Sequence, residues 1–69
     1  MTLPIEFELE VDGRWIAEVP ALPGVLAYGS TQAEAKSNVL ALALRVIADR
    51  LEHGEEIPDV VAEWFAVPA

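Results

Sequence analysis

A chain of 69 residues without cysteine has room for one domain, residues 1–69, and no disulfide can stabilise it. Its formal charge of −8, from 12 acidic and 4 basic residues, repels phosphate backbones and disfavours direct binding to nucleic acid. Apolar residues make up 54% of the chain, more than so small an interior can bury, so we expect a homo-oligomer, a dimer or higher.

The first predicted elements are two strands joined by a tight turn. Apolar and acidic residues alternate along residues 5–12, and a second alternating run occupies residues 15–19. A three-residue turn with a left-handed Gly13 pairs Leu9 with Trp15 and gathers the large apolar side chains on one face. We prefer it to a two-residue turn, which would place Trp15 among the acidic side chains.

The next segment changes the direction of the chain. Residues 20–24 contain two prolines and a glycine, and proline lacks the backbone donor that a central strand needs. Residues 25–28 are then predicted to form a short third strand, which Gly29 ends.

A helix of about 20 residues is predicted to begin at Thr31 and to stop near His53 and Gly54. Thr31 and Glu34 have the spacing of a capping box, in which each side chain accepts from the other residue's backbone amide. Gly54 suits the left-handed position that follows many helices.

The apolar residues of this helix fall on two neighbouring stripes. We expect the first stripe to cover the sheet, and the second to need the C-terminal segment or another subunit as a cover. The first stripe is Ala35, Val39, Leu42 and Val46, and the second is Leu40, Leu44, Ile47 and Leu51.

The C-terminal part is predicted to be a polar connector, residues 55–59, and a final strand, residues 60–67, which is rich in β-branched and aromatic residues. Residues 60–65 fit neither the strand nor the helix period cleanly and could instead form one or two helical turns. On a strand, Trp64 and Phe65 would point to opposite faces, so that one of them stays available to a subunit or partner. The whole is an α+β fold, with a small antiparallel or mixed sheet and one long helix on one face.

Several segments together resemble the signature of HicB-family antitoxins. A strand leads into Pro-x-Leu-Pro-Gly, a short strand leads into Gly-Ser-Thr, and Glu-Ala and Asn follow on the helix, over a match that spans residues 5–58. The matching residues are Arg14 to Gly24, Tyr28 to Thr31, Glu34, Ala35 and Asn38.

This resemblance implies a degraded ribonuclease-H-like unit of order β-β-β-α-β. It also implies that the protein binds HicA, a small basic toxin that cleaves mRNA, and covers its active surface. Family members commonly carry a C-terminal ribbon-helix-helix or helix-turn-helix domain that binds operator DNA. These 69 residues do not include such a domain, so we expect no operator binding from them.

A ribonuclease-H-like fold prompts a search for carboxylates that could hold two metal ions. Glu6, Glu8 and Glu10 are the candidates, but side chains two residues apart on a strand are about 7 Å apart, which fits a solvated face better than paired metals about 4 Å apart. His53 has no second histidine or cysteine with which to bind zinc. We therefore expect no enzyme, with no catalytic residue, metal or cofactor; a metal-dependent nuclease is the remote alternative.

The main hypothesis is a non-catalytic, antitoxin-like module that neutralises a small basic HicA-type toxin, which its negative charge would attract. The alternative is a stand-alone HicB-like structural or regulatory oligomerisation domain without a toxin partner. Either function would use the second helix stripe, the C-terminal aromatic residues and the acidic residues after the helix. These candidate interface residues are Leu40, Leu44, Ile47, Leu51, Trp64, Phe65, Glu52, Glu55 and Glu56.

The sequence indicates a cytoplasmic protein. The longest apolar run, residues 39–44, is far shorter than the roughly 20 residues that cross a membrane. The first residues lack both the basic start and the long apolar run of a secretory signal. The absence of cysteine agrees with a reducing compartment.

Overall fold

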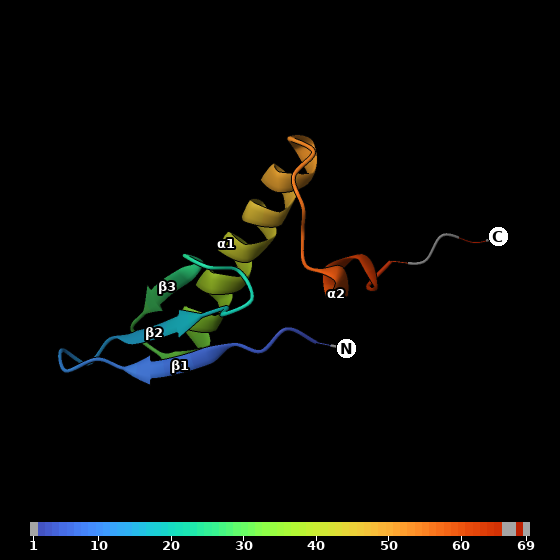
Figure 1. Ribbon diagram of the computed structural model, residues 1–69. Helices are drawn as coiled ribbons and strands as arrows, with labels where there is room; N and C mark the ends of the chain where they lie inside the picture. The colour runs from blue at the N-terminus through green and yellow to red at the C-terminus, as the bar shows by residue number, and fades with distance from the viewer. Residues whose placement is uncertain (1, 66–67, 69) are drawn as a thin grey trace.

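The computed structural model describes residues 2–65 and 68 and consists of an antiparallel sheet with one long helix on one face (Figure 1). This is the predicted α+β architecture, and the first four elements come in the predicted order. The elements are β1 (Glu6–Leu9), β2 (Trp15–Glu18), β3 (Leu26–Gly29), α1 (Gln32–Glu52) and α2 (Asp59–Ala62), and the strands lie in the order β1-β2-β3. No helix within residues 2–65 is long and apolar enough to cross a membrane.

The hairpin of β1 and β2 has the predicted register, with Leu9 opposite Trp15. Gly13 has a φ of 88°, the left-handed conformation that the three-residue turn requires. The Glu10 backbone N–H donates to the Arg14 carbonyl oxygen at 2.7 Å, and the Gly13 N–H donates to the Glu10 carbonyl oxygen at 3.0 Å. The turn therefore fixes which face of each strand carries the apolar side chains.

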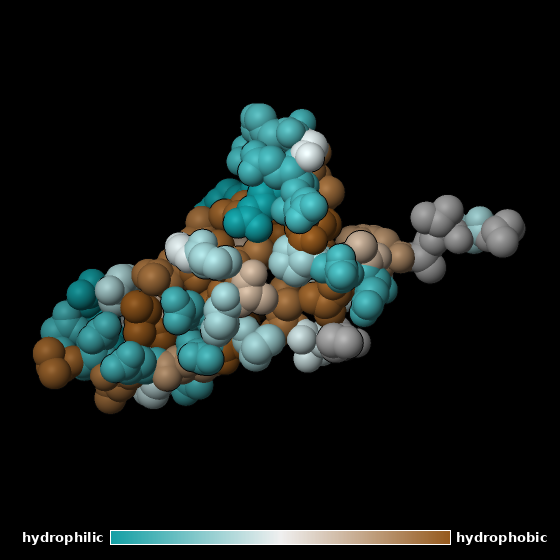
Figure 2. Space-filling view, viewed as in Figure 1, coloured by the Kyte–Doolittle hydropathy of each residue, from teal (hydrophilic) through white to brown (hydrophobic). Residues whose placement is uncertain are grey.

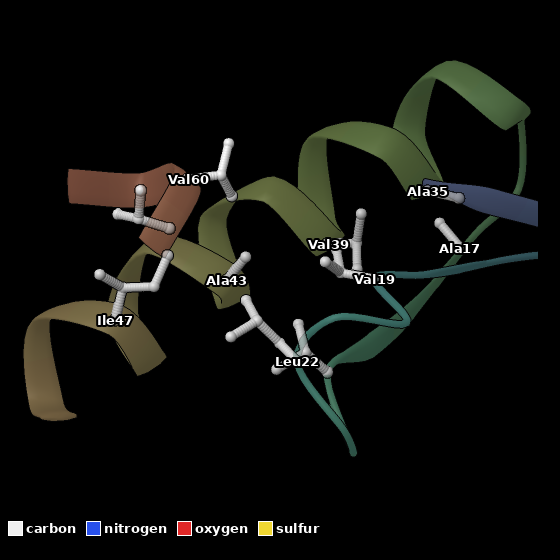
Figure 3. Close-up of a cluster of buried hydrophobic side chains, with 10 residues drawn as sticks. Ala17, Val19, Leu22, Ala35, Val39, Ala43, Ile47 and Val60 are labelled. Carbon is white, nitrogen blue, oxygen red and sulfur yellow. The ribbon is translucent and has the colours of Figure 1, made fainter. Parts of the chain in front are cut away.

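The loop of residues 20–24 turns the chain and also supplies a core side chain. The Leu22 N–H donates to the Val19 carbonyl oxygen at 2.9 Å, and the Val25 N–H donates to the Leu22 carbonyl oxygen at 3.0 Å. Gly24, with a φ of 85°, completes the turn. Leu22 has no exposed surface, so this loop contributes a fully buried side chain to the core (Figure 3).

The ends of α1 are defined by local hydrogen bonds. Thr31 Oγ1 accepts from the Glu34 N–H at 3.0 Å, as predicted. The Glu34 carboxylate does not bond back to Thr31; it accepts from the backbone N–H of Ser30 at 3.1 Å and from its hydroxyl at 3.2 Å. At the other end Gly54 has a φ of 68°, and the amide after it donates to the Arg50 carbonyl oxygen at 2.8 Å, the hydrogen bond of a Schellman motif.

The first helix stripe was predicted only in part. Leu42 and Val46 are half-buried at its flank and not on the central row. The helix approaches closely because β3 ends in Gly29, where any Cβ would collide with the backbone of Ala35. The residues of α1 that reach the core are spaced four apart, as Figure 3 shows: Ala35, Val39, Ala43 and Ile47.

The predicted final strand, residues 60–67, is wrong for the residues that the structure describes, because residues 59–62 form the short helix α2. Adjacent Val60 and Val61 are both buried, whereas neighbours on a strand would point to opposite faces. Val60 and Ile47 belong to one buried cluster, to which α2 and α1 both contribute (Figure 3). The alternative of a helical turn is thus the correct one, and residues 66 and 67 lie outside the described residues.

Candidate partner-binding surface

A groove without charged side chains opens on the side of α1 that faces the N-terminal segment. It has a volume of about 450 Å³. Its walls come from the segment before β1, the Leu22 loop, α1 and the turn after α2. The side chains that matter most for a partner are Leu3, Ile5, Leu22, Leu40, Leu44 and Trp64, and we call this the apolar groove.

The second helix stripe is largely uncovered, as the sequence indicated. Leu40, Leu44 and Leu51 are 42%, 58% and 57% exposed. Leu40 and Leu44 line the apolar groove, whereas Leu51 lies beyond it. Ile47, the remaining residue of this stripe, is 6% exposed as a member of the core and also lines the apolar groove.

The two C-terminal aromatic residues are both exposed, Trp64 by 47% and Phe65 by 76%. They follow α2 in a turn, so the expectation that a strand would bury one and present the other is wrong. The Trp64 N–H donates to the Val61 carbonyl oxygen at 3.2 Å, which continues the helical winding for one residue. Trp64 lines the apolar groove beside Leu40 and Leu44.

The predicted acidic residues Glu52, Glu55 and Glu56 are exposed at the C-terminal end of α1. Figure 2 shows this end as hydrophilic, whereas hydrophobic residues reach the surface between the sheet and α2. The interface predicted from the sequence therefore joined two surfaces that lie apart in the structure, the apolar groove and the acidic C-terminal end of α1.

The outer face of the sheet is the face that α1 does not cover. Sequence reasoning identified its glutamates as a solvated face but missed its apolar part. The register places Ile16 opposite both Glu8 and Tyr28 on this face, and Glu6 opposite Glu18. Like charges directly opposite each other destabilise a sheet. The alternation of Leu26 and Tyr28 in β3 could have revealed the apolar part of this face.

The outer face also carries a cation over an aromatic ring. The guanidinium carbon of Arg14 lies 4.5 Å from the centre of the Tyr28 ring, and its Nε donates to the Asp12 carboxylate at 2.8 Å. The Arg14 backbone N–H, which donates to Asp12 Oδ1 at 3.0 Å, is the larger cause that lowers the pKa of Asp12, and the side-chain bond adds to it. Arg14 is thus engaged with its own turn and with the Tyr28 ring.

Within residues 2–65, no group of three or more histidine, aspartate or glutamate side chains is close enough to hold a metal ion. The ring of His53 contacts the Asp49 carbonyl oxygen at 2.7 Å and its carboxylate at 3.4 Å. These contacts hold the His53 ring against the last turn of α1.

The chain resembles one curated protein closely enough to assign a relationship. The UPF0150 protein Ta0767 of Thermoplasma acidophilum is 38% identical over 58 residues, which cover 84% of each chain. No family model matches the chain, and no solved structure matches it.

Proposed function

The chain belongs to the UPF0150 family, and we propose that it is a non-catalytic binding module of the HicB antitoxin type, which neutralises a small basic partner by covering its active surface. The proposal joins the HicB-like signature in residues 14–38 to the chemistry of the surface. A chain of charge −8 attracts a basic protein, and an uncharged groove provides the contact that holds it.

The observation that carries the proposal is the apolar groove itself. Leu44 and Trp64 expose about half of their surface at a single hollow without charged walls. Large apolar side chains at one depression are typical of the centre of a protein interface. The acidic residues elsewhere on the chain would act at longer range, on the rate of association.

A second candidate function is self-association through the same groove. Exposed Leu40 and Leu44 favour it, because the cover that the second helix stripe needs is only partly supplied by α2. In this case the protein would be a structural or regulatory oligomer without a toxin partner. Sedimentation equilibrium of the isolated chain distinguishes a dimer or higher oligomer from a monomer.

Calorimetry tests the main proposal. The probe is the product of a short basic reading frame next to the gene for this chain, purified and titrated at low and high salt. We expect tight binding that weakens with salt, and loss of the partner's RNA cleavage in the complex.

A pair of matched variants locates the contact. Leu44→Ser should weaken binding by about tenfold or more, which corresponds to about 1.4 kcal/mol, whereas Val11→Ser in the hairpin turn, which is fully exposed and lines no part of the groove, should not. Absence of heat with a folded, RNA-cleaving basic partner would exclude the antitoxin function.

A further inference from the structure

The strand β1 lies at one margin of the sheet and has a free edge (Figure 1). The Glu10 N–H points toward β2, because it donates to Arg14. Backbone groups alternate in direction along a strand, so the N–H and C=O groups of Phe7 and Leu9 point away from the sheet. Within residues 2–65, no hydrogen bond covers these outward groups.

The opposite margin of the sheet is β3, and one of its outward backbone groups is already hydrogen-bonded. By the same alternation the Tyr28 carbonyl oxygen points outward from β3, and the side chain of Asn38 donates to it at 2.8 Å. The helix α1 packs on β2 and β3 and leaves β1 the least covered of the strands. One outward acceptor of β3 is therefore already in use, whereas no hydrogen bond within residues 2–65 engages the outward groups of Phe7 and Leu9 on β1.

The two sides of the β1 edge differ in chemistry. On the helix side, Ile5 and Phe7 border a hollow of about 610 Å³, whose other wall is the first turns of α1 with Ala33 and Lys36. On the outer face, Glu6 and Glu8 are exposed. Neighbouring residues of a strand placed at this edge would meet these two environments alternately.

Resting on the proposed function, we propose that β1 receives an extended segment of the basic partner, in which apolar residues alternate with lysine or arginine. Its backbone would pair with the outward groups of Phe7 and Leu9. Its apolar side chains would enter the hollow beside Ile5, where Lys36 repels a second cation. Its basic side chains would lie beside Glu6 and Glu8 and relieve the repulsion between Glu6 and Glu18.

A second copy of this chain is a poor occupant of the same edge. Its own β1 would place acidic side chains against Glu6 and Glu8, and like charges at paired positions are destabilising. The charge pattern of the edge thus selects a basic strand over self-pairing.

Two capped hexapeptides and two matched double variants test this pairing. One peptide alternates lysine with valine, and the other alternates glutamate with valine. The first should bind the natural chain, and Glu6→Lys with Glu8→Lys should weaken it about tenfold and give measurable binding of the glutamate peptide. Glu55→Lys with Glu56→Lys, which changes the net charge equally at the far end of α1, should leave the preference for lysine intact.

Amide hydrogen exchange supplies a readout that does not depend on variants. The lysine peptide should slow exchange at Phe7 and Leu9, and a peptide of three lysines followed by three valines should not. Equal binding to both double variants, protection elsewhere than β1, or no binding up to the solubility limit would each overturn strand addition. The calorimetry with the whole basic protein still decides the proposed function, so the two failures are distinguishable.

Discussion

The Asn38 side-chain nitrogen Nδ2 donates to the Tyr28 carbonyl oxygen over 2.8 Å and so joins α1 to the outer margin of β3. Both residues belong to the segments that resemble the HicB signature, and neither lines the apolar groove. The bond engages one outward backbone acceptor of β3 with a group from the helix that covers the sheet. Within residues 2–65, no hydrogen bond engages the outward groups of Phe7 and Leu9 at the β1 edge.

Replacing Asn38 by aspartate should destabilise the domain by about 0.5–1.5 kcal/mol, because a carboxylate cannot donate to the Tyr28 carbonyl. Aspartate has nearly the same helix propensity as asparagine, so the change isolates the donor. Urea unfolding measures the difference. Ser37→Asp adds the same charge one residue earlier, and an equal loss in both variants would show that charge alone is responsible.

Leu22→Ala should cost about 2–5 kcal/mol, which is a large share of the stability of so small a domain. Leu22 has no exposed surface, whereas Leu26 on the outer face is 37% exposed. Leu26→Ala should therefore cost less than about 1 kcal/mol in the same urea experiment. Comparable losses would mean that the loop of residues 20–24 is not a fixed part of the core.

Gly29→Ala should cost at least about 1–3 kcal/mol, since the new methyl group would collide with backbone and not with a flexible side chain. The added Cβ would lie 2.8 Å from the Glu34 carbonyl carbon. Gly54→Ala is the control, because no atom lies within 4 Å of a Cβ there and only the left-handed φ of 68° opposes it. Thermal unfolding should rank Gly29→Ala as the more damaging change; the reverse order would contradict the close approach of helix and sheet.

The hairpin turn should make a contribution to stability that depends on pH. Hydrogen bonds from Arg14 lower the pKa of Asp12, so folding favours the charged carboxylate. The contribution is present above the usual pKa of aspartate and is lost as the pH falls through the lower pKa of the folded state. Asp12→Asn should therefore destabilise the domain at neutral pH, and its difference from the natural chain should vanish in strong acid.

Nuclear magnetic resonance titration of the Asp12 carboxyl carbon measures that pKa directly. Glu56→Gln removes one negative charge at the far end of α1 and serves as the control. A pKa of Asp12 at or above its usual value would rule out the proposed origin in Arg14.

The hairpin and the helix bounds could be predicted because short-range chemistry determines them. Gly13 permits one turn that gathers the apolar side chains, and Thr31 and Gly54 carry the hydrogen-bonding and conformational properties of helix ends. In each case the residues involved lie close together in the sequence. The α+β class followed from these elements.

The packing and the C-terminal segment could not be derived in the same way. The helical spacing predicted Leu42 and Val46 on the stripe that covers the sheet, whereas Ala43 and Ile47 reach the core and the close approach at Gly29 favours small residues. Val60 and Val61 suit a strand by composition, yet both are buried on one turn of helix beside Ile47. Such choices depend on contacts between distant segments, which a periodicity does not reveal.

The sequence identified Leu40, Leu44 and Trp64 of the candidate surface. It did not indicate how far the apolar groove extends. The stripe of Leu40 and Leu44 was visible as a surplus of apolar surface, whereas the wall made by Leu3 and Ile5 required the path of the chain. Predicting which apolar residues share the outer face also required the register between β2 and β3.

The close approach of α1 to the sheet through alanine and glycine also has a thermodynamic consequence. Among the described residues the buried core consists mostly of alanine and valine, with Leu22 and Ile47 as its larger members. Small side chains expose less hydrocarbon to water on unfolding, so the heat capacity should rise only modestly. Stability would then vary gently with temperature, and the melting transition of the isolated domain would be broad.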